Sequence, residues 1–408
     1  MAKHGELIVG LDIGTTKVCV VVGEVTEDGI DVIGIGSHPS KGLRKGVVIN
    51  LEATVSSIKR AVEEAELMAG CEISTVHAGI SGGHIRGFNS HGVVAIKSGE
   101  VTANDVARCI EAAKAVAIPS DRQVLHVIPQ EYIIDGQAGI HEAIGMAGVR
   151  LEAKVHIVTG AVSSAQNIIK ACNKCGLNVS ALVLDQVASS SAVLTEEEKE
   201  LGCAVVDIGG GTTDIALWSR GTVVHSSVVA VGGNHLTNDI AVGLRSPMAE
   251  AERIKHKAGC AMVSMVGPEE LIEIPSVGGR APRSLPRRVL AEIIEPRMEE
   301  IFALVHREIQ NSGFEEQLSS GVVLTGGTAI LDGIPELAEQ ILQLPVRRGL
   351  PRRVGGLVDV VRSPKFSTAV GLVGYGASHH DEDLFKVKEE RMLQRMRRQI
   401  SSWFREIV

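Results

Sequence analysis

The chain has 408 residues, of which 44% are hydrophobic but only 2% aromatic, and its formal net charge at pH 7 is −8. This length allows two or three ordinary domains, and the abundance of Val, Ile, Ala and Gly is typical of buried parallel strands covered by helices. The charge is unevenly distributed along the chain. The residues after Phe385 include seven Lys or Arg and three Glu, so this C-terminal end has a net charge of +4 and the rest of the chain has −12. An acidic body with one basic end argues against general nucleic-acid binding and predicts a single localised anionic partner.

The first residues do not read as a secretory signal, because Gly10, Asp12 and Gly14 interrupt any apolar segment. No run approaches the roughly 20 apolar residues of a membrane span, and the seven scattered cysteines predict a reducing, cytoplasmic environment. Cys172 and Cys175 form a C-x-x-C pair at the end of a helical pattern, but no second pair completes a metal or redox site. We therefore interpret this pair as structural.

In chain order, residues 6–36 predict three strands, and apolar residues over 51–68 follow the 3.6-residue period of an amphipathic helix. The pattern changes over 85–157, where strands and a helix near 103–116 predict an inserted subdomain. The main pattern then resumes with V-H-I-V-T-G and a helix, and it ends in the strand A-L-V-L-D at 181–185.

A second half begins at Cys203, and most of its 230–310 stretch is predicted to be helical, with a strand L-I-E-I-P and a basic loop, G-G-R-A-P-R-S-L-P-R-R. The strand V-V-L-T and a helix around 366–376 complete this half. The predicted units are a first lobe (1–84 and 158–199), the inserted subdomain (85–157), a second lobe (200–229 and 311–378), a capping subdomain (230–310), a linker (379–386) and a terminal helix (387–408).

Two similar turns, each between two predicted strands, contain residue types that are suited to binding phosphate. V-G-L-D-I-G-T-T-K spans 9–17 and V-V-D-I-G-G-G-T-T-D spans 205–214, while V-L-T-G-G-T at 323–328 adds another strand followed by a glycine turn. Glycines let backbone N–H groups approach phosphates closely, and threonine hydroxyls add donors. Asp12 and Asp207 predict a Mg²⁺ ion held through water, because this ion commonly keeps several waters and few protein ligands. Two matched hairpins that face each other would hold a nucleotide between two half-domains.

This set of motifs resembles the actin-like ATPase superfamily. The resemblance implies an α/β fold with two lobes, duplicated from a ribonuclease H-like unit, and it implies ATP and Mg²⁺ as cofactors. The first hairpin would be the phosphate-1 loop, the second the phosphate-2 loop, and G-G-T the adenosine motif. The predicted nucleotide-binding residues are Asp12, Gly14, Thr15, Thr16, Lys17, Asp207, Gly209, Gly210, Gly211, Thr212, Thr213, Gly232, Gly233, Asn234, Glu252, Lys255, Gly326, Gly327 and Thr328.

Some of these residues also have ordinary structural interpretations. Backbone donors at 232–234 would meet phosphate or ribose, or they would simply begin a helix. Glu252 and Lys255 are spaced for an intrahelical ion pair, although the E-x-x-K spacing resembles the ribose- and adenine-contacting helix of DnaK-type chaperones. Lys17 is either a mobile cation for the phosphates or a solvated lysine at the end of a strand.

Hydrolysis in this superfamily needs a polar group near the attacking water, at the turn after the strand A-L-V-L-D. Asp185 or Gln186 is the candidate for that role, with Asp207 or Asp12 orienting the water or the metal ion. The sequence predicts ATP binding and at most weak hydrolysis.

Longer segments resemble the FtsA family of bacterial cell-division proteins across essentially the whole chain. They are V-L-H-V-I-P-Q-E-Y-I-I-D-G-Q-A-G-I at 124–140, G-V-R-L-E-A-K-V-H-I-V-T at 148–159, and the block at 274–297. The resemblance implies a self-associating adaptor that attaches filaments of the tubulin-like FtsZ to the inner face of the cytoplasmic membrane at the division septum. It also implies recruitment of later division proteins through the inserted subdomain. The basic residues that would receive the FtsZ tail are Arg280, Arg283, Arg287 and Arg288.

The C-terminal end independently predicts a helix that lies on a membrane surface. An apolar stripe with helical spacing is flanked by arginines, and the acidic stretch H-H-D-E-D separates it from the body. Two heptads are too few for a convincing coiled coil, although a short coiled coil or a helix docked on the body remains the alternative. The residues predicted to face an anionic lipid surface are Met392, Leu393, Met396, Ile400, Trp403, Phe404, Ile407, Arg395, Arg397, Arg398 and Arg405.

Two other functions on the same fold compete with this interpretation. One is a pilus-assembly adaptor of the PilM type, which would not need a basic amphipathic C-terminus. The other is a small-molecule kinase, which would need a substrate pocket and a catalytic base that the sequence does not reveal.

Overall fold

A computed structural model describes residues 6–26, 29–274 and 282–379 of the chain. Two sheets form the centre of this fold, one of six strands in the order β11-β6-β1-β2-β3-β19 and one of five in the order β14-β13-β12-β17-β18. In each sheet three consecutive strands pair antiparallel as hairpins, and two later strands add in parallel on the side of the first of them. In the six-stranded sheet β19 also adds in parallel beside β3, at the opposite edge. This shared topology confirms the internal duplication predicted from the two hairpin motifs.

Glycine-rich turns and runs of β-branched residues set the bounds of these strands. The six-stranded sheet contains β1 (Leu7–Ile13), β2 (Lys17–Thr26), β3 (Gly29–Pro39), β6 (Thr75–Ile80), β11 (Asn178–Leu184) and β19 (Val354–Gly356). The five-stranded sheet contains β12 (Cys203–Ile208), β13 (Thr213–Ser219), β14 (Thr222–Val229), β17 (Val322–Thr325) and β18 (Val346–Arg348). We call the first sheet and its helices the first lobe, and the second sheet and its helices the second lobe.

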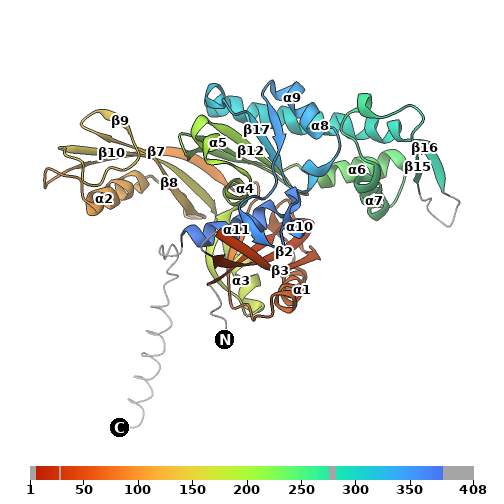
Figure 1. The fold of residues 1–408 in the computed structure, drawn as a ribbon, viewed down its shortest axis with the longest axis horizontal. Helices are drawn as coiled ribbons and strands as arrows, with labels where there is room; N and C mark the ends of the chain where they lie inside the picture. Colours follow the sequence, from red (N-terminus) through yellow and green to blue (C-terminus); the bar gives the residue numbers. More distant parts are fainter. Residues whose placement is uncertain (1–5, 27–28, 275–281, 380–408) are drawn as a thin grey trace, which may run out of the picture.

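Helices cover both sheets, and one pair lies between them. The helices are α1 (Leu51–Ala69), α3 (Val162–Lys174), α4 (Asp185–Val193), α5 (Glu196–Leu201), α6 (Gly233–Leu244), α7 (Met248–Ala258), α8 (Arg287–Ser312), α9 (Ile334–Leu342), α10 (Val358–Val361) and α11 (Ser367–Ser378). Figure 1 shows α4 and α11 at the centre of the molecule. Val21 of the first sheet and Val205 of the second belong to one buried cluster with Ala369 of α11, so the two lobes share a hydrophobic core.

Helix α1 shows how local sequence produces an element of the first lobe. Its N-cap Asn50 accepts a hydrogen bond from the backbone of the first turn, and Gly70 ends it in the left-handed conformation with φ of 68°. The helix buries Ile58 and Ala61 against the sheet. It lies so close to β3 that a Cβ on Gly36 would collide with the backbone carbonyl of Ala61.

The segment between β6 and α3 forms a separate sheet with the strand order β7-β10-β8-β9. Its elements are β7 (Arg86–Ala95), α2 (Ala103–Lys114), β8 (Arg122–Ile134), β9 (Gln137–Ile140) and β10 (Arg150–Ala161). Leu151, Val155 and Ile157 are fully buried in its own core, together with Cys109 of α2. This inserted subdomain extends from one side of the molecule, opposite the arm that carries α6 and α7 (Figure 1).

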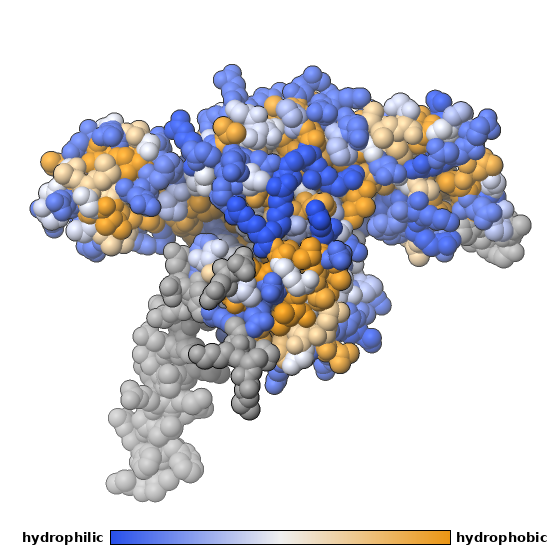
Figure 2. All heavy atoms as spheres, in the orientation of Figure 1, coloured by the Kyte–Doolittle hydropathy of each residue, from blue (hydrophilic) through white to orange (hydrophobic). Residues whose placement is uncertain are grey.

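The arm on the other side contains two further short strands, β15 (Leu271–Ile274) and β16 (Arg283–Pro286), which pair antiparallel. Another small hairpin, β4 (Leu43–Arg44) with β5 (Val47–Val48), precedes α1. The face shown in Figure 2 is a mixture of hydrophilic and hydrophobic areas, and hydrophobic residues are visible on the inserted subdomain, on the lower lobe and on the arm. Exposed apolar side chains of the inserted subdomain include Val93, Ile144 and Val149.

Candidate functional site

The two D-I-G hairpins face each other across one cavity of about 890 Å³. Each is a tight turn, because Gly14 N–H donates to Lys17 O at 3.0 Å and Gly209 N–H donates to Thr212 O at 2.9 Å. The turns lie in contact, since a Cβ on Gly210 would collide with the side chain of Thr16. Glycine is therefore required here by the approach of the opposite hairpin.

The structure brings most of the predicted residues to the wall of this cavity. The predicted residues that line it are Asp12, Gly14, Thr15, Thr16, Lys17, Asp185, Asp207, Gly209, Gly210, Gly211, Thr212, Gly233, Asn234, Glu252, Lys255, Gly326, Gly327 and Thr328. Thr213 and Gly232 lie outside the lining, and the Thr213 hydroxyl donates to Val231 O at 2.9 Å instead. Gln186 also lies outside it, although its side chain is fully buried.

Four aspartates with restricted solvent access line the cavity. Asp12 and Asp207 are the second-last residues of β1 and β12, Asp214 is the second residue of β13, and Asp185 begins α4. Burial raises the pKa of Asp207 to about 6, although a hydrogen bond of 3.0 Å from Thr368 acts in the opposite direction. Burial and the neighbouring carboxylates also raise the pKa of Asp185 and of Asp214. This excess of carboxylates favours a cation in the cavity.

Lys17 supplies part of the balancing positive charge, because its Nζ lies 2.6 Å from Asp12 Oδ2. Burial acts to lower the pKa of Lys17, but the Asp12 carboxylate raises it above the ordinary value, so this side chain stays charged. Among the described residues, no group of three or more His, Cys, Asp or Glu side chains has the geometry of a direct metal site. The donor set of Asp12 and Asp207 fits a metal ion that is held through water molecules.

Asp185 and Gln186 occupy different surroundings, although they are adjacent in sequence. Asp185 lines the cavity, and its Oδ1 is buried without a hydrogen-bond partner in the described part of the chain. Both amide atoms of Gln186 are likewise without a partner there, but they lie in the protein interior. Of the two residues, Asp185 is the one placed to meet a molecule in the cavity.

The start of α6 differs from the prediction that its backbone donors would meet a ligand. Gly233 N–H donates to Gly209 O at 2.9 Å, and Asn234 N–H donates to Gly210 O at 2.8 Å. Thr328 also donates to Gly209 O, at 3.1 Å. These donors hold the second hairpin in place, and direct contact of this segment with phosphate or ribose stays a prediction.

Glu252 and Lys255 form the predicted ion pair on α7, with 2.8 Å between Lys255 Nζ and Glu252 Oε2, and both line the cavity. Lys255 also donates to Gly233 O at 3.1 Å and to Thr237 Oγ1 at 2.9 Å. Burial lowers the pKa of Lys255, while Glu252 acts to raise it. The pair thus joins α6 to α7 at the edge of the cavity, and the two interpretations offered by the sequence are compatible.

Sequence reasoning missed several cavity residues. Thr368 hydrogen-bonds Asp207, and Lys365 also lines the cavity, with its Nζ 4.7 Å from the centre of the Phe366 ring. No local motif marks either residue: Thr368 lies in the first turn of α11, and Lys365 lies in the short 3-10 helix that precedes it. Asp214, by contrast, was visible as the last residue of the second hairpin motif.

The predicted basic loop of the arm is only partly a loop. Arg283 lies in β16 and donates to Leu244 O at 2.6 Å, whereas Arg287 and Arg288 begin α8. Arg287 is held by Glu270 at 2.7 Å and Asp332 at 3.2 Å, and Arg288 pairs with a glutamate one turn later in its own helix. Arg280 lies outside the described residues.

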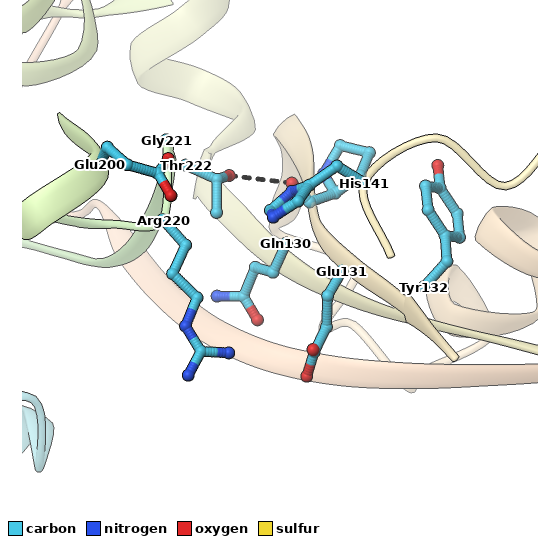
Figure 3. A pocket seen from close by; sticks show the side chains of 9 residues that line it. Gln130, Glu131, Tyr132, His141, Glu200, Arg220, Gly221 and Thr222 are labelled. Atoms are coloured by element: carbon cyan, nitrogen blue, oxygen red, sulfur yellow. Dashed lines mark hydrogen bonds between the residues drawn. The ribbon is translucent and has the colours of Figure 1, made fainter. Parts of the chain in front are cut away.

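A second cavity of about 400 Å³ lies where the inserted subdomain meets the β13–β14 turn (Figure 3). Thr222 Oγ1 donates to Pro129 O at 2.8 Å across this junction. Figure 3 shows the side chain of Arg220, from the β13–β14 turn, extending beside those of Gln130 and Glu131 of β8. Glu131 is paired with a lysine of β10 at 2.7 Å. The cavity shares no lining residue with the larger one. It therefore belongs to the subdomain junction.

The predicted terminal helix at 387–408 and most of the linker lie outside the described residues. Over the residues that the structure covers, no helix is long and apolar enough to cross a membrane.

Comparison with known proteins places these features in a family context. The family model for cell division protein FtsA matches residues 204–371, and the model for the SHS2 domain inserted in FtsA matches residues 82–159. The cell division protein FtsA of Pseudomonas aeruginosa is 54% identical over 94% of this chain and 92% of its own length. The FtsA of Escherichia coli K12 is 46% identical over 100% of this chain and 97% of its own.

Solved structures of similar fold are more distant in sequence. A PilM–PilN type IV pilus biogenesis complex aligns with a TM-score of 0.65 at 18% identity, covering 90% of this chain and 98% of the other. MreB5 of Spiroplasma citri bound to ADP aligns with a TM-score of 0.56 at 15% identity, covering 91% and 97%. These likenesses confirm the predicted actin-like fold with its inserted subdomain.

Proposed function

The chain belongs to the FtsA family of cell-division proteins, and from that premise we propose that it binds ATP and Mg²⁺ between its lobes, self-associates, and tethers FtsZ filaments to the inner face of the cytoplasmic membrane at the division septum. The inserted subdomain would recruit later division proteins. The observation that carries the nucleotide part is the single cavity lined by both hairpins and by the Glu252–Lys255 pair.

Each part of the cavity suits a different part of a nucleotide. Asp12 and Asp207 would hold the hydrated Mg²⁺, which would supply positive charge to the phosphates. The two glycine turns and Lys17 would face the phosphates, while Glu252 and Lys255 would face the ribose and the base. We assign the water-facing role in hydrolysis to Asp185, because Gln186 does not reach the cavity. The four neighbouring carboxylates mean that ATP binding depends on the metal ion.

Weak binding by one terminal helix explains why self-association would matter. Eight apolar side chains, the seven predicted above and Val408, would give roughly 12 kcal/mol at full burial, but an interfacial helix buries only part of each. Ordering about fifteen residues costs about 1 kcal/mol or more of conformational entropy per residue. Each arginine near an anionic leaflet contributes about 1 kcal/mol of electrostatic attraction. One chain would therefore bind reversibly, and a filament carrying many such helices would bind firmly through avidity.

We propose the arm formed by α6, α7 and the β15–β16 hairpin as the face that receives the FtsZ tail. The exposed arginines Arg283 and Arg288 and the exposed apolar side chains Val242 and Leu271 support this assignment. Arg287 is excluded from direct contact, because its guanidinium is already occupied by Glu270, Asp332 and a backbone carbonyl.

The proposal is tested by co-pelleting FtsZ polymers with anionic liposomes, using the full chain and a truncation after Phe385, each with and without ATP and Mg²⁺. We expect FtsZ to reach the liposomes only with the intact chain and more completely with ATP. FtsZ that stays in solution while the protein itself pellets would remove FtsZ as the partner. Absence of liposome binding would remove the membrane role and favour the docked-helix or coiled-coil alternative.

A double substitution of Arg283 and Arg288 by Ser tests the docking face. Arg60→Ser is the matched control, since Arg60 is an exposed arginine on α1 of the first lobe, outside the arm. We expect weaker binding of an FtsZ tail peptide only in the double variant. Equal affinities in the two variants would remove these arginines from the docking face.

The two competing functions lose support for different reasons. The likeness to the pilus complex is one of fold alone, at 18% identity. The small-molecule kinase would require a second substrate site, and the family membership gives no basis for one.

A further inference from the structure

The residue that follows β6 makes a contact between the lobes that the motifs do not account for. Ser81 is 6% exposed, and its hydroxyl donates to Asp214 Oδ1 on β13 of the second lobe. Asp214 is 3% exposed, and its other carboxylate oxygen accepts from Thr212 Oγ1 at 2.9 Å. Ser81 Oγ also lies 3.4 Å from Thr212 Oγ1, but the Ser81 proton is committed to the nearer carboxylate. Asp214 is thus held once within its own lobe and once across the cleft.

This contact lies directly beside the nucleotide cavity. Asp214 and Thr212 line that cavity, and both belong to the second hairpin. Opening of the lobes would separate Ser81 from Asp214 and leave a buried carboxyl oxygen without its donor, which costs free energy because that oxygen is shielded from water. The hydrogen bond therefore favours the closed arrangement.

The turn that carries Ser81 also leads into the inserted subdomain. Ile85 N–H donates to Gly82 O at 3.0 Å and closes this turn. Arg122, the first residue of β8, donates to His84 O at 2.8 Å, and Arg86, the first residue of β7, donates to Gly83 O at 2.9 Å. A short, internally braced turn consequently connects the cavity, the first lobe and the inserted subdomain.

We propose that Ser81 and Asp214 form an interlobe latch that holds the two lobes closed around a bound nucleotide and slows its release. This inference rests on the proposed nucleotide function. Ser81 is a positioning residue, because it does not line the cavity and acts through Asp214. Only its hydroxyl is required, and among the described residues no other group of the first lobe donates a hydrogen bond to Asp214.

The test uses the full chain with Ser81→Ala, which removes the donor, and Ser81→Cys, which replaces it by a weak donor of similar size. Ser90→Ala is the matched control, because the Ser90 hydroxyl donates to Ala113 O at 2.7 Å within the inserted subdomain, away from the cleft. Two readouts are measured. The first is hydrogen exchange over 81–85 and 209–214 without nucleotide, and the second is the rate at which excess ATP displaces a fluorescent ATP analogue in the presence of Mg²⁺.

We expect faster exchange in both segments and about tenfold faster release for the two Ser81 variants, in line with the loss of one buried hydrogen bond. We expect neither change for Ser90→Ala. Unchanged exchange would overturn the latch itself. Faster exchange with unchanged release would overturn its effect on the nucleotide. If the unmodified chain binds no analogue, the proposed nucleotide function fails, and the exchange data alone decide whether the lobes are latched.

Discussion

Replacing Asp207 by Asn should stabilise the protein at high pH when neither metal ion nor nucleotide is present. Burial raises the pKa of Asp207 to about 6, compared with 3.8 for an ordinary aspartate, so the folded state holds a proton that the unfolded state has already released. The free energy of unfolding therefore falls as the pH rises from about 4 to above 6, and this decrease is complete above about pH 7. The gap between the two pKa values corresponds to about 3 kcal/mol.

The assay is urea unfolding, followed by circular dichroism, in a metal chelator at pH 5, 6, 7 and 8. We expect the unfolding free energy of the Asp207→Asn variant to exceed that of the unmodified chain by up to about 3 kcal/mol at pH 8. This difference should become smaller toward pH 5. Asn retains the oxygen that accepts from Thr368, so this hydrogen bond is kept. Asp359→Asn, on the exposed surface of α10, is the control. A stability difference for Asp207→Asn that does not grow with pH would refute the reasoning.

Three further substitutions test the cavity and the arm. Lys255→Met should weaken ATP binding about 10- to 100-fold in calorimetric titration, because it removes a buried charged donor; unchanged affinity would exclude α7 from the nucleotide site. Gly210→Ala should cost about 1–3 kcal/mol of unfolding free energy, because its Cβ collides with the first hairpin, while Gly83→Ala, whose Cβ would have ordinary contacts, should cost far less. Arg287→Ala should lower the unfolding free energy measured in urea by about 2–3 kcal/mol, because the side chain loses its three partners. Arg288→Ala should lower it by less than about 0.5 kcal/mol. Equal decreases would contradict the bracing role of Arg287.

Local chemistry in the sequence was enough to predict the hairpins and the helices that carry the main motifs. Asp12 with Gly14, and Asp207 with Gly209, mark turns whose geometry depends only on neighbouring residues. The apolar period of 51–68 predicted α1 within one residue, because its cap and its buried face are both encoded in adjacent positions. The repeated motif also predicted the duplicated sheets, since each hairpin begins one of them.

Tertiary structure alone decided which groups meet. The sequence does not reveal that Thr368 contacts Asp207, that Ser81 donates to Asp214, or that Arg287 is occupied by Glu270, because these partners come from different elements of the fold. The same holds for the backbone N–H groups at the start of α6. The motif alone does not show that they have partners, but in the folded protein they donate hydrogen bonds to the second hairpin. A turn forms from interactions between adjacent residues, whereas a hydrogen-bond partner is chosen by how helices and sheets pack, and packing depends on the whole chain.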